Sequence, residues 1–242
     1  MLRSDSFPSA VRDLALEAAN DLGGVLVLLR PLPRRITVRL ERCGESAEAV
    51  WLEQTAEILL CDEMLGYAVQ FSDAPRSIAR FILAHELGHA VADELGEVAS
   101  GSGEADADQF AAVFLLATGR FGPDVRAAAQ LMRQLGEHPE LLDATRAERL
   151  ERAAALDCLV AGWQDSTATA CAQVYALARD RWSRRVLQPE RRRKPATDAP
   201  QAISVHTSAY VPLHTLPRPH RPALDARHRA RTLADPPERA RH

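Results

Sequence analysis

The sequence lacks an apolar run long enough to span a membrane. The run Val25–Leu29 is far shorter than the roughly 20 residues that a membrane helix needs. Residues Met1–Pro8 do not contain the apolar core that signal peptides have. We therefore expect a protein without a membrane partner. Its expected location is cytoplasmic by default, or exported if the true start lies upstream of Met1.

Cysteine and aromatic residues are also few, with 4 Cys, 6 Phe, 3 Trp and 3 Tyr among 242 residues. Because no C-x-x-C pair occurs, a zinc site built from cysteine thiolates is not expected. Cys43 and Cys61 follow consecutive predicted strands. They would pair in an oxidising compartment and would be buried thiols in the cytosol.

The composition is that of a globular protein, with 46% hydrophobic and 26% charged residues. The net charge of −3 hides an asymmetry between two parts of the chain. From Ser183 onward there are thirteen Lys and Arg against five acids, which makes this part basic and leaves the body acidic. We expect a folded domain over residues 1–183 and a disordered basic tail, rich in Pro, Arg and His, over 184–242.

The tail carries the only basic run, Arg191–Lys194. No aromatic residue or recognised motif accompanies this run, so we interpret it as solvated and do not expect a nucleic-acid partner. The sequence does not indicate an oligomeric state.

Short alternating segments predict a small sheet. Ile36, Val38 and Leu40 alternate with polar residues, which is typical of a half-buried strand. The runs 49–53 and 57–61 complete an expected three-stranded antiparallel sheet. Its edge could bind an extended peptide by β-augmentation or could simply pack against a helix, and the sequence does not separate these alternatives.

Helical patterns account for the rest of the body. A first amphipathic helix ends near Gly23 or continues to Pro31. After the segment that carries the motif described next, further helices are expected over 123–135, 144–161 and 167–182, separated by Gly and Pro. The second half of the body should therefore be all helix.

The motif His85-Glu86-Leu87-Gly88-His89 lies inside one of these helical patterns. Residues four apart share a helix face, so His85 and His89 can bind one metal ion while Glu86 lies beside it. The alternative is that the H-E-x-x-H motif occurs here by chance. Its context favours a metal site, because positions 78, 82, 85, 89 and 92 form one inward face of a helix that begins near Pro75. Gly88 lowers helix propensity, which indicates that a neighbour packs closely there, in a zincin often the sheet edge or the substrate.

A third ligand is available at the start of the next helix. Glu104 and Asp108 lie four residues apart and therefore share a face. We expect Glu104 to bind the metal and Asp108 to accept the distal N–H of a ligating His, which would fix the orientation of that ring. The alternative is that acidic residues favour the first helical turn because of the macrodipole.

These motifs carry a family resemblance. The H-E-L-G-H-A helix followed by E-x-x-x-D resembles the gluzincin metallopeptidases. Together with the segments 36–44, 58–65 and 104–112, it resembles an uncharacterised bacterial metallopeptidase family over about residues 10–185. The resemblance implies a minimal zincin-like α+β fold, in which the sheet packs on the H-E-x-x-H helix. It also implies one Zn²⁺ bound by His85, His89 and Glu104.

The expected function is zinc-dependent hydrolysis of peptide bonds in a peptide or protein substrate. Glu86 would act as general base toward a zinc-bound water and return the proton to the leaving amine. The alternative is a non-catalytic or regulatory zinc module, such as an IrrE-like regulator or a degenerate peptidase. A tail residue such as His206 could also reach an open catalytic site and inhibit it. The candidates for oxyanion stabilisation, His138, Arg146 and Tyr175, are left unassigned.

Overall fold

The computed structural model describes most of the body of the chain and one short segment of the tail. The described residues are 7–26, 29, 32–43, 49–96, 103–136, 146–167, 170–186 and 204–207. Their helices are α1 (Phe7–Gly23), α2 (Asp62–Phe71), α3 (Pro75–Glu94), α4 (Glu104–Ala117), α5 (Gly122–Gly136), α6 (Arg146–Gln164) and α7 (Ala170–Arg185). Their strands are β1 (Thr37–Glu41), β2 (Val50–Leu52), β3 (Glu57–Cys61) and β4 (Ser204–Thr207). The predicted α+β fold is confirmed.

The sheet is mixed, with the order β2-β3-β1-β4, so the prediction of an antiparallel sheet was wrong in detail. The strands β2 and β3 pair antiparallel, with Trp51 opposite Ile58. In contrast, β1 and β3 are parallel, with Val38 opposite Ile58. The short turn Glu53–Thr55 returns the chain directly onto β2, so β1 pairs with the other edge of β3. Alternation in sequence specifies the buried face of a strand but not its partner.

The strand β4 comes from the segment that was predicted to be a disordered tail. Its residues 204–207 pair with β1 in parallel, so the prediction of disorder does not hold for these four residues. Helix α7 also continues past the expected boundary at residue 183, and Val186 is fully buried. The rest of the predicted tail lies outside the described residues, and the proposed division at residue 183 stays a prediction.

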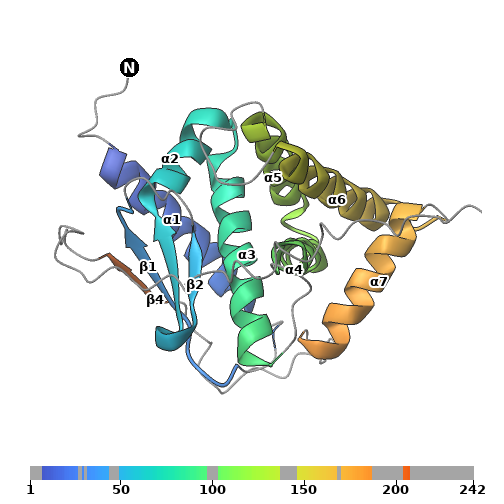
Figure 1. The fold of residues 1–242 in the computed structure, drawn as a ribbon, viewed down its shortest axis with the longest axis horizontal. Helices are drawn as coiled ribbons and strands as arrows, with labels where there is room; N and C mark the ends of the chain where they lie inside the picture. The colour runs from blue at the N-terminus through green and yellow to red at the C-terminus, as the bar shows by residue number, and fades with distance from the viewer. Residues whose placement is uncertain are drawn as a thin grey trace, which may run out of the picture. The chain divides into compact units, whose positions relative to one another are not determined.

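Helix α4 forms the centre of the hydrophobic core. All residues from Phe110 to Leu116 are buried. Phe110 contacts Phe114 and the ring of Trp182, and the Trp182 indole N–H donates a hydrogen bond to Gln109 at 3.2 Å. In Figure 1 the sheet and α1 lie on one side of α3, and α4 to α7 lie on the other. Helix α3 therefore stands between the sheet and the helical half.

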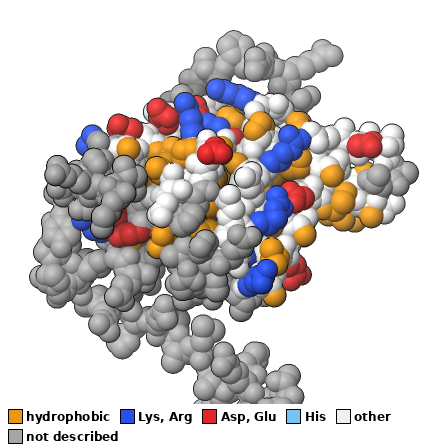
Figure 2. Space-filling model, turned by 90° about the horizontal axis from the view of Figure 1, so that it is seen from above, with side chains coloured by type: hydrophobic (Ala, Val, Ile, Leu, Met, Phe, Trp, Pro, Cys, Tyr) orange, Lys and Arg blue, Asp and Glu red, His pale blue; other side chains and the backbone are white. Residues whose placement is uncertain are grey.

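The predicted helices in the second half lie close to α5, α6 and α7. Helix α2 was not predicted. It begins immediately after β3 and carries Asp62 and Glu63 in its first turn, where acidic side chains favour the positive end of the helix. None of the described helices is long and apolar enough to cross a membrane. The face seen in Figure 2 mixes basic, acidic and hydrophobic side chains.

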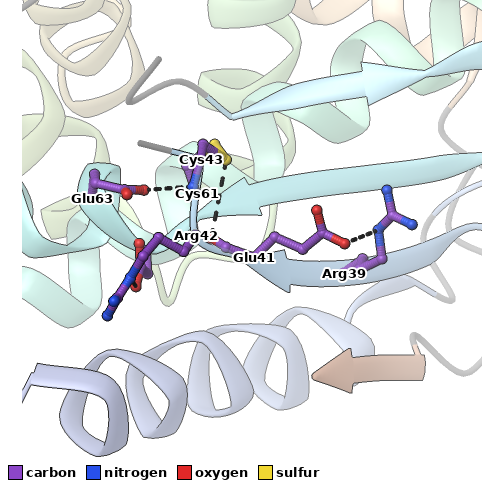
Figure 3. Close-up of a disulfide and its surroundings, with 7 residues drawn as sticks. Arg39, Glu41, Arg42, Cys43, Cys61 and Glu63 are labelled. Carbon is purple, nitrogen blue, oxygen red and sulfur yellow. Dashed lines mark hydrogen bonds and ion pairs between the residues drawn. A yellow bond between two sulfur atoms is a disulfide. The ribbon is translucent and has the colours of Figure 1, made fainter. Parts of the chain in front are cut away.

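Two disulfides join the four cysteines. Cys43 and Cys61 link the ends of the parallel strands β1 and β3, next to the start of α2 (Figure 3). Glu63 accepts a hydrogen bond from the backbone N–H of Cys43 at 3.0 Å. Cys158 and Cys171 link α6 to α7. The pairing of Cys43 with Cys61, which the sequence led us to expect in an oxidising compartment, is thus present in the structure.

Candidate metal centre

Helix α3 carries the H-E-x-x-H residues at its buried centre. His85 is 7% exposed and Glu86 is 5% exposed, while His89 is half-buried. The two imidazoles face each other, and their Nε2 atoms are 3.2 Å apart. The helix is anchored to the sheet because the Trp51 indole of β2 donates a hydrogen bond to Asp93 at 3.1 Å.

Glu104, the first residue of α4, completes a group of three donors. Its carboxylate oxygens lie 3.3 Å from His85 Nε2 and 3.4 Å from His89 Nε2. All three ligand atoms lie within 4.8 Å of one another. The structure therefore brings together the three residues that the sequence predicted as metal ligands.

Close packing of α3 on α4 places Glu104. A Cβ at Gly88 would lie 3.0 Å from Ala107 Cα and 3.1 Å from Ala107 O. The close neighbour expected at Gly88 is therefore helix α4, and not the sheet edge or a substrate strand. Gly103 has φ 81°, and its carbonyl accepts a hydrogen bond from the Ala107 N–H, so α4 begins directly at Glu104.

Asp108 lies one turn after Glu104, and its Oδ1 is 2.8 Å from His85 Nδ1. Since an ionised carboxylate can only accept, His85 donates from Nδ1, and in the neutral imidazole that binds a metal the lone pair of Nε2 would point toward His89 and Glu104. This is the geometry that the role predicted for Asp108 requires, in which an outer carboxylate orients a ligating His.

Arg152 on α6 is a site residue that the sequence did not reveal. Its Nε and Nη2 donate to Asp108 at 2.7 and 3.0 Å, and its Nη1 lies 3.1 Å from Glu104 Oε2. One guanidinium thus holds both the third donor and the carboxylate that orients His85. The only hint in the sequence is that Arg146, Arg149 and Arg152 are spaced by three, which is common on a solvated helix face.

The ionisable groups of the centre strongly shift one another's pKa values. Burial lowers the pKa of His85, but hydrogen bonds to Asp108 and Glu104 outweigh burial and raise it to about 10. Burial raises the pKa of Glu104, yet hydrogen bonds from both imidazoles hold it well below its usual range. The carboxylates therefore favour a positive charge between them. A bound metal ion would supply that charge.

The donor set fits a transition-metal ion. Two imidazole nitrogens and one carboxylate oxygen are the protein ligands of a common class of catalytic zinc site, whose fourth position stays open. A second group of candidate ligands, Cys43, Cys61 and Glu63, has both sulfurs joined in a disulfide and so lacks thiolate donors.

The candidate centre forms part of the wall of a cavity of about 620 Å³. Its polar wall includes residues 49–51 of the sheet edge and Glu148, Arg149 and Arg152 of α6, of which Arg152 contacts Glu104 and Arg149 donates to the Leu135 carbonyl. The remaining wall is apolar and comes from α2, α3 and α5. A ligand of several residues could therefore reach the three donors and Glu86 from the cavity.

Comparison with known proteins gives one match. A family model described as "Putative metallopeptidase" matches residues 18–185. The chain belongs to this family. No curated protein and no solved structure matches the chain. The span matched by the metallopeptidase family contains both helices that carry the three donors, together with Arg152 on α6, and it ends with α7.

Two of the candidates for oxyanion stabilisation, Arg146 and Tyr175, are not among the described residues that line the cavity. Arg146 is exposed at the start of α6, and Tyr175 is buried on α7. His138 lies outside the described residues. His206 lies on β4, at the opposite edge of the sheet from β2. The strands β3 and β1 separate it from the cavity, which argues against the suggested inhibition by His206.

Proposed function

We propose that this protein is a zinc-dependent metallopeptidase that hydrolyses peptide bonds, with His85, His89 and Glu104 as ligands. The observation that carries the proposal is the convergence of three donor atoms within 4.8 Å on the wall of a peptide-sized cavity, beside a buried Glu86. When bound, zinc supplies a Lewis acid that acidifies a water molecule and polarises the substrate carbonyl.

Glu86 is the proposed general base and acid. Burial and the nearby Glu104 carboxylate raise its pKa, whereas the neighbouring imidazoles and a hydrogen bond from the Trp51 backbone N–H lower it. The net effect is a raised pKa, which suits a carboxylate that must first accept a proton and later release it. Glu86 would take a proton from the attacking water and return it to the leaving amine.

The sheet edge supports an extended substrate. Strand β2 is the outermost strand on its side, and Ala49, Val50 and Trp51 line the cavity. An edge strand offers unpaired backbone groups to which a peptide can add. Because the Trp51 N–H donates to Glu86, the same strand both positions the proposed base and borders the path of the substrate.

The alternative, a purely structural or regulatory zinc module, predicts a closed site with four protein ligands. Within the described residues the group contains three, and it opens into the cavity. This arrangement favours the catalytic proposal. A bound zinc without turnover would favour the alternative.

The proposal is tested by zinc content and peptide cleavage in the full chain. We expect about one tightly bound zinc in the wild type, lost in His89→Ala and Glu104→Ala but kept in Glu151→Ala, an exposed acid on α6. We expect Glu86→Gln to keep the zinc and lose peptide cleavage. Folded wild type that binds no zinc after reconstitution would refute the proposal, and cleavage by Glu86→Gln would remove Glu86 from the mechanism.

A further inference from the structure

We propose that the apolar half of the cavity is a specificity pocket for a large aliphatic or aromatic side chain next to the scissile bond. This inference rests on the proposed peptidase function. The wall of this half includes Met64, Ile78, Ile82, Leu131, Met132 and Leu135. The charged side chain that borders this half is Arg149, because its Nη1 donates to the Leu135 carbonyl at 2.6 Å.

The pocket and the candidate metal centre are lined by the same face of helix α3. Ile82 and Ile78 precede His85 by three and seven residues on α3, so they lie on the same face of that helix. At a rise of about 1.5 Å per residue they lie roughly 4.5 and 10 Å along the axis from His85. An extended peptide advances about 3.3 Å per residue, so a residue beside the cleaved bond can place its side chain there.

A buried ion pair joins the two long walls of the pocket, α3 and α5. Arg80 on α3 donates to Asp124 on α5 at 2.6 and 2.8 Å, and it also donates to Asp21 on α1 at 2.8 Å. Asp124 is only 1% exposed. A buried ion pair of this kind fixes the spacing of α3 and α5, because closing the gap would disturb its geometry.

The apolar walls form a cluster separate from the main core. Ile78, Leu131, Leu135 and Ala68 are buried together, while the main core centres on α4. Filling the adjoining space with a Leu or Phe side chain removes apolar surface from water on both partners. A Lys or Asp side chain would lose its hydration there. The neighbouring Arg149 guanidinium already donates to the Leu135 carbonyl.

The discriminating experiment uses fluorescein-labelled alanine heptapeptides with Leu, Phe, Ala, Asp or Lys at the centre. We expect the zinc-loaded full chain to cleave beside Leu or Phe with kcat/KM on the order of tenfold to a hundredfold above Ala, and to disfavour Asp and Lys. Met132→Trp should fill the pocket and reduce the Leu-to-Ala ratio to a few-fold. The matched control is Gln130→Trp, the same change at an exposed position of α5.

Binding to zinc-loaded Glu86→Gln separates the two proposals. Cleavage without a preference for Leu or Phe, or a preference that Met132→Trp leaves unchanged, would overturn the pocket and leave the peptidase function standing. Tighter binding of the Leu and Phe peptides to Glu86→Gln, without cleavage by wild type, would support the pocket and refute the peptidase. Neither cleavage nor selective binding would overturn both. Circular dichroism establishes that each variant is folded.

Discussion

Arg152 is the residue that connects the candidate centre to the rest of the helical half. It contacts Glu104 and Asp108, and Asp108 in turn contacts His85. Burial raises the pKa of Asp108, but hydrogen bonds from His85 and Arg152 outweigh burial and lower it. The carboxylate is 4% exposed, so its charge depends on these partners and not on water.

We expect Arg152→Gln to lower the free energy of unfolding by about 3 kcal/mol, because it leaves Asp108 buried with one charged partner fewer. Urea unfolding of the metal-free protein measures this change. Arg133→Gln is the control, because Arg133 pairs with Asp157 at an exposed position, where an ion pair contributes less than about 1 kcal/mol. A loss no larger in Arg152→Gln than in the control would contradict the role assigned to the Arg152 guanidinium.

Asp62, beside the Cys43–Cys61 disulfide, gives a prediction about pH. Burial raises its pKa from 3.8 to about 6, helped by the neighbouring Glu63 and opposed by Arg42. A raised carboxyl pKa stabilises the fold at low pH, and this contribution is lost as pH rises through about 6. Asp62→Asn should therefore gain stability relative to wild type between about pH 4 and pH 7. Urea unfolding across that range measures the difference.

The control for the Asp62 prediction is Asp73→Asn, an exposed acid before α3. If the difference between Asp62→Asn and wild type stayed constant over the same pH range, the raised pKa would be wrong.

At the residue scale, the spacing of residues along each helix predicted which candidate ligands lie on the same helix face. His85 and His89 share a face of one helix, and Glu104 and Asp108 share a face of the next, so each pair follows from helix geometry. Arg152 lies 44 residues beyond Asp108 on a separate helix. Its position depends on how α6 packs against α4, and no local pattern in the sequence encodes that packing.

At the scale of elements, the contact between α3 and α4 assembles the donors. Gly88→Ala would place a Cβ 3.0 Å from Ala107 Cα, so α4 would have to move by a few tenths of an ångström. Because Glu104 and Asp108 lie on α4, we expect zinc affinity to fall on the order of tenfold, as it does when groups that orient ligands are disturbed. Competition with a chelator measures this affinity.

Gly23→Ala is the matched control for Gly88→Ala, because nothing lies within 4 Å of a Cβ at Gly23. Equal zinc affinity in Gly88→Ala and Gly23→Ala would show that the spacing of α3 and α4 does not control the centre.

The elements themselves were largely predictable, whereas their pairing was not. Alternation located β1, because a half-buried strand must alternate, and two further short runs located β2 and β3, all to within two residues. The parallel pairing of β1 with β3 depends on the link between them and on the tight turn before β3. Helix α2 begins directly at the end of β3, without the Gly or Pro punctuation that marked the helices of the second half.

At the scale of the whole molecule, the two disulfides bear on where the protein folds. They join all four cysteines, and such bonds persist in oxidising compartments and are rare in the cytosol. This pairing is therefore typical of a protein that folds in an oxidising compartment. Peptide mapping without reduction should recover the pairs Cys43–Cys61 and Cys158–Cys171 from protein made in an oxidising compartment.

Reduction should also destabilise the fold, by about 3 kcal/mol for each bond, since loops of this length gain roughly that much freedom in the unfolded chain. Thermal unfolding with and without a reductant measures the change. Four reactive thiols in native protein from an oxidising compartment would show that the pairs do not form.

The burial of α4 determines when the proposed metal site can form during folding. Its first residue, Glu104, is a proposed ligand, and the following turns form the centre of the core. The nascent chain therefore cannot assemble the three donors until α4 has docked on α3. Synthesis of the protein would then be separated in time from the proposed hydrolytic activity, and a partly folded chain would not cleave neighbouring proteins.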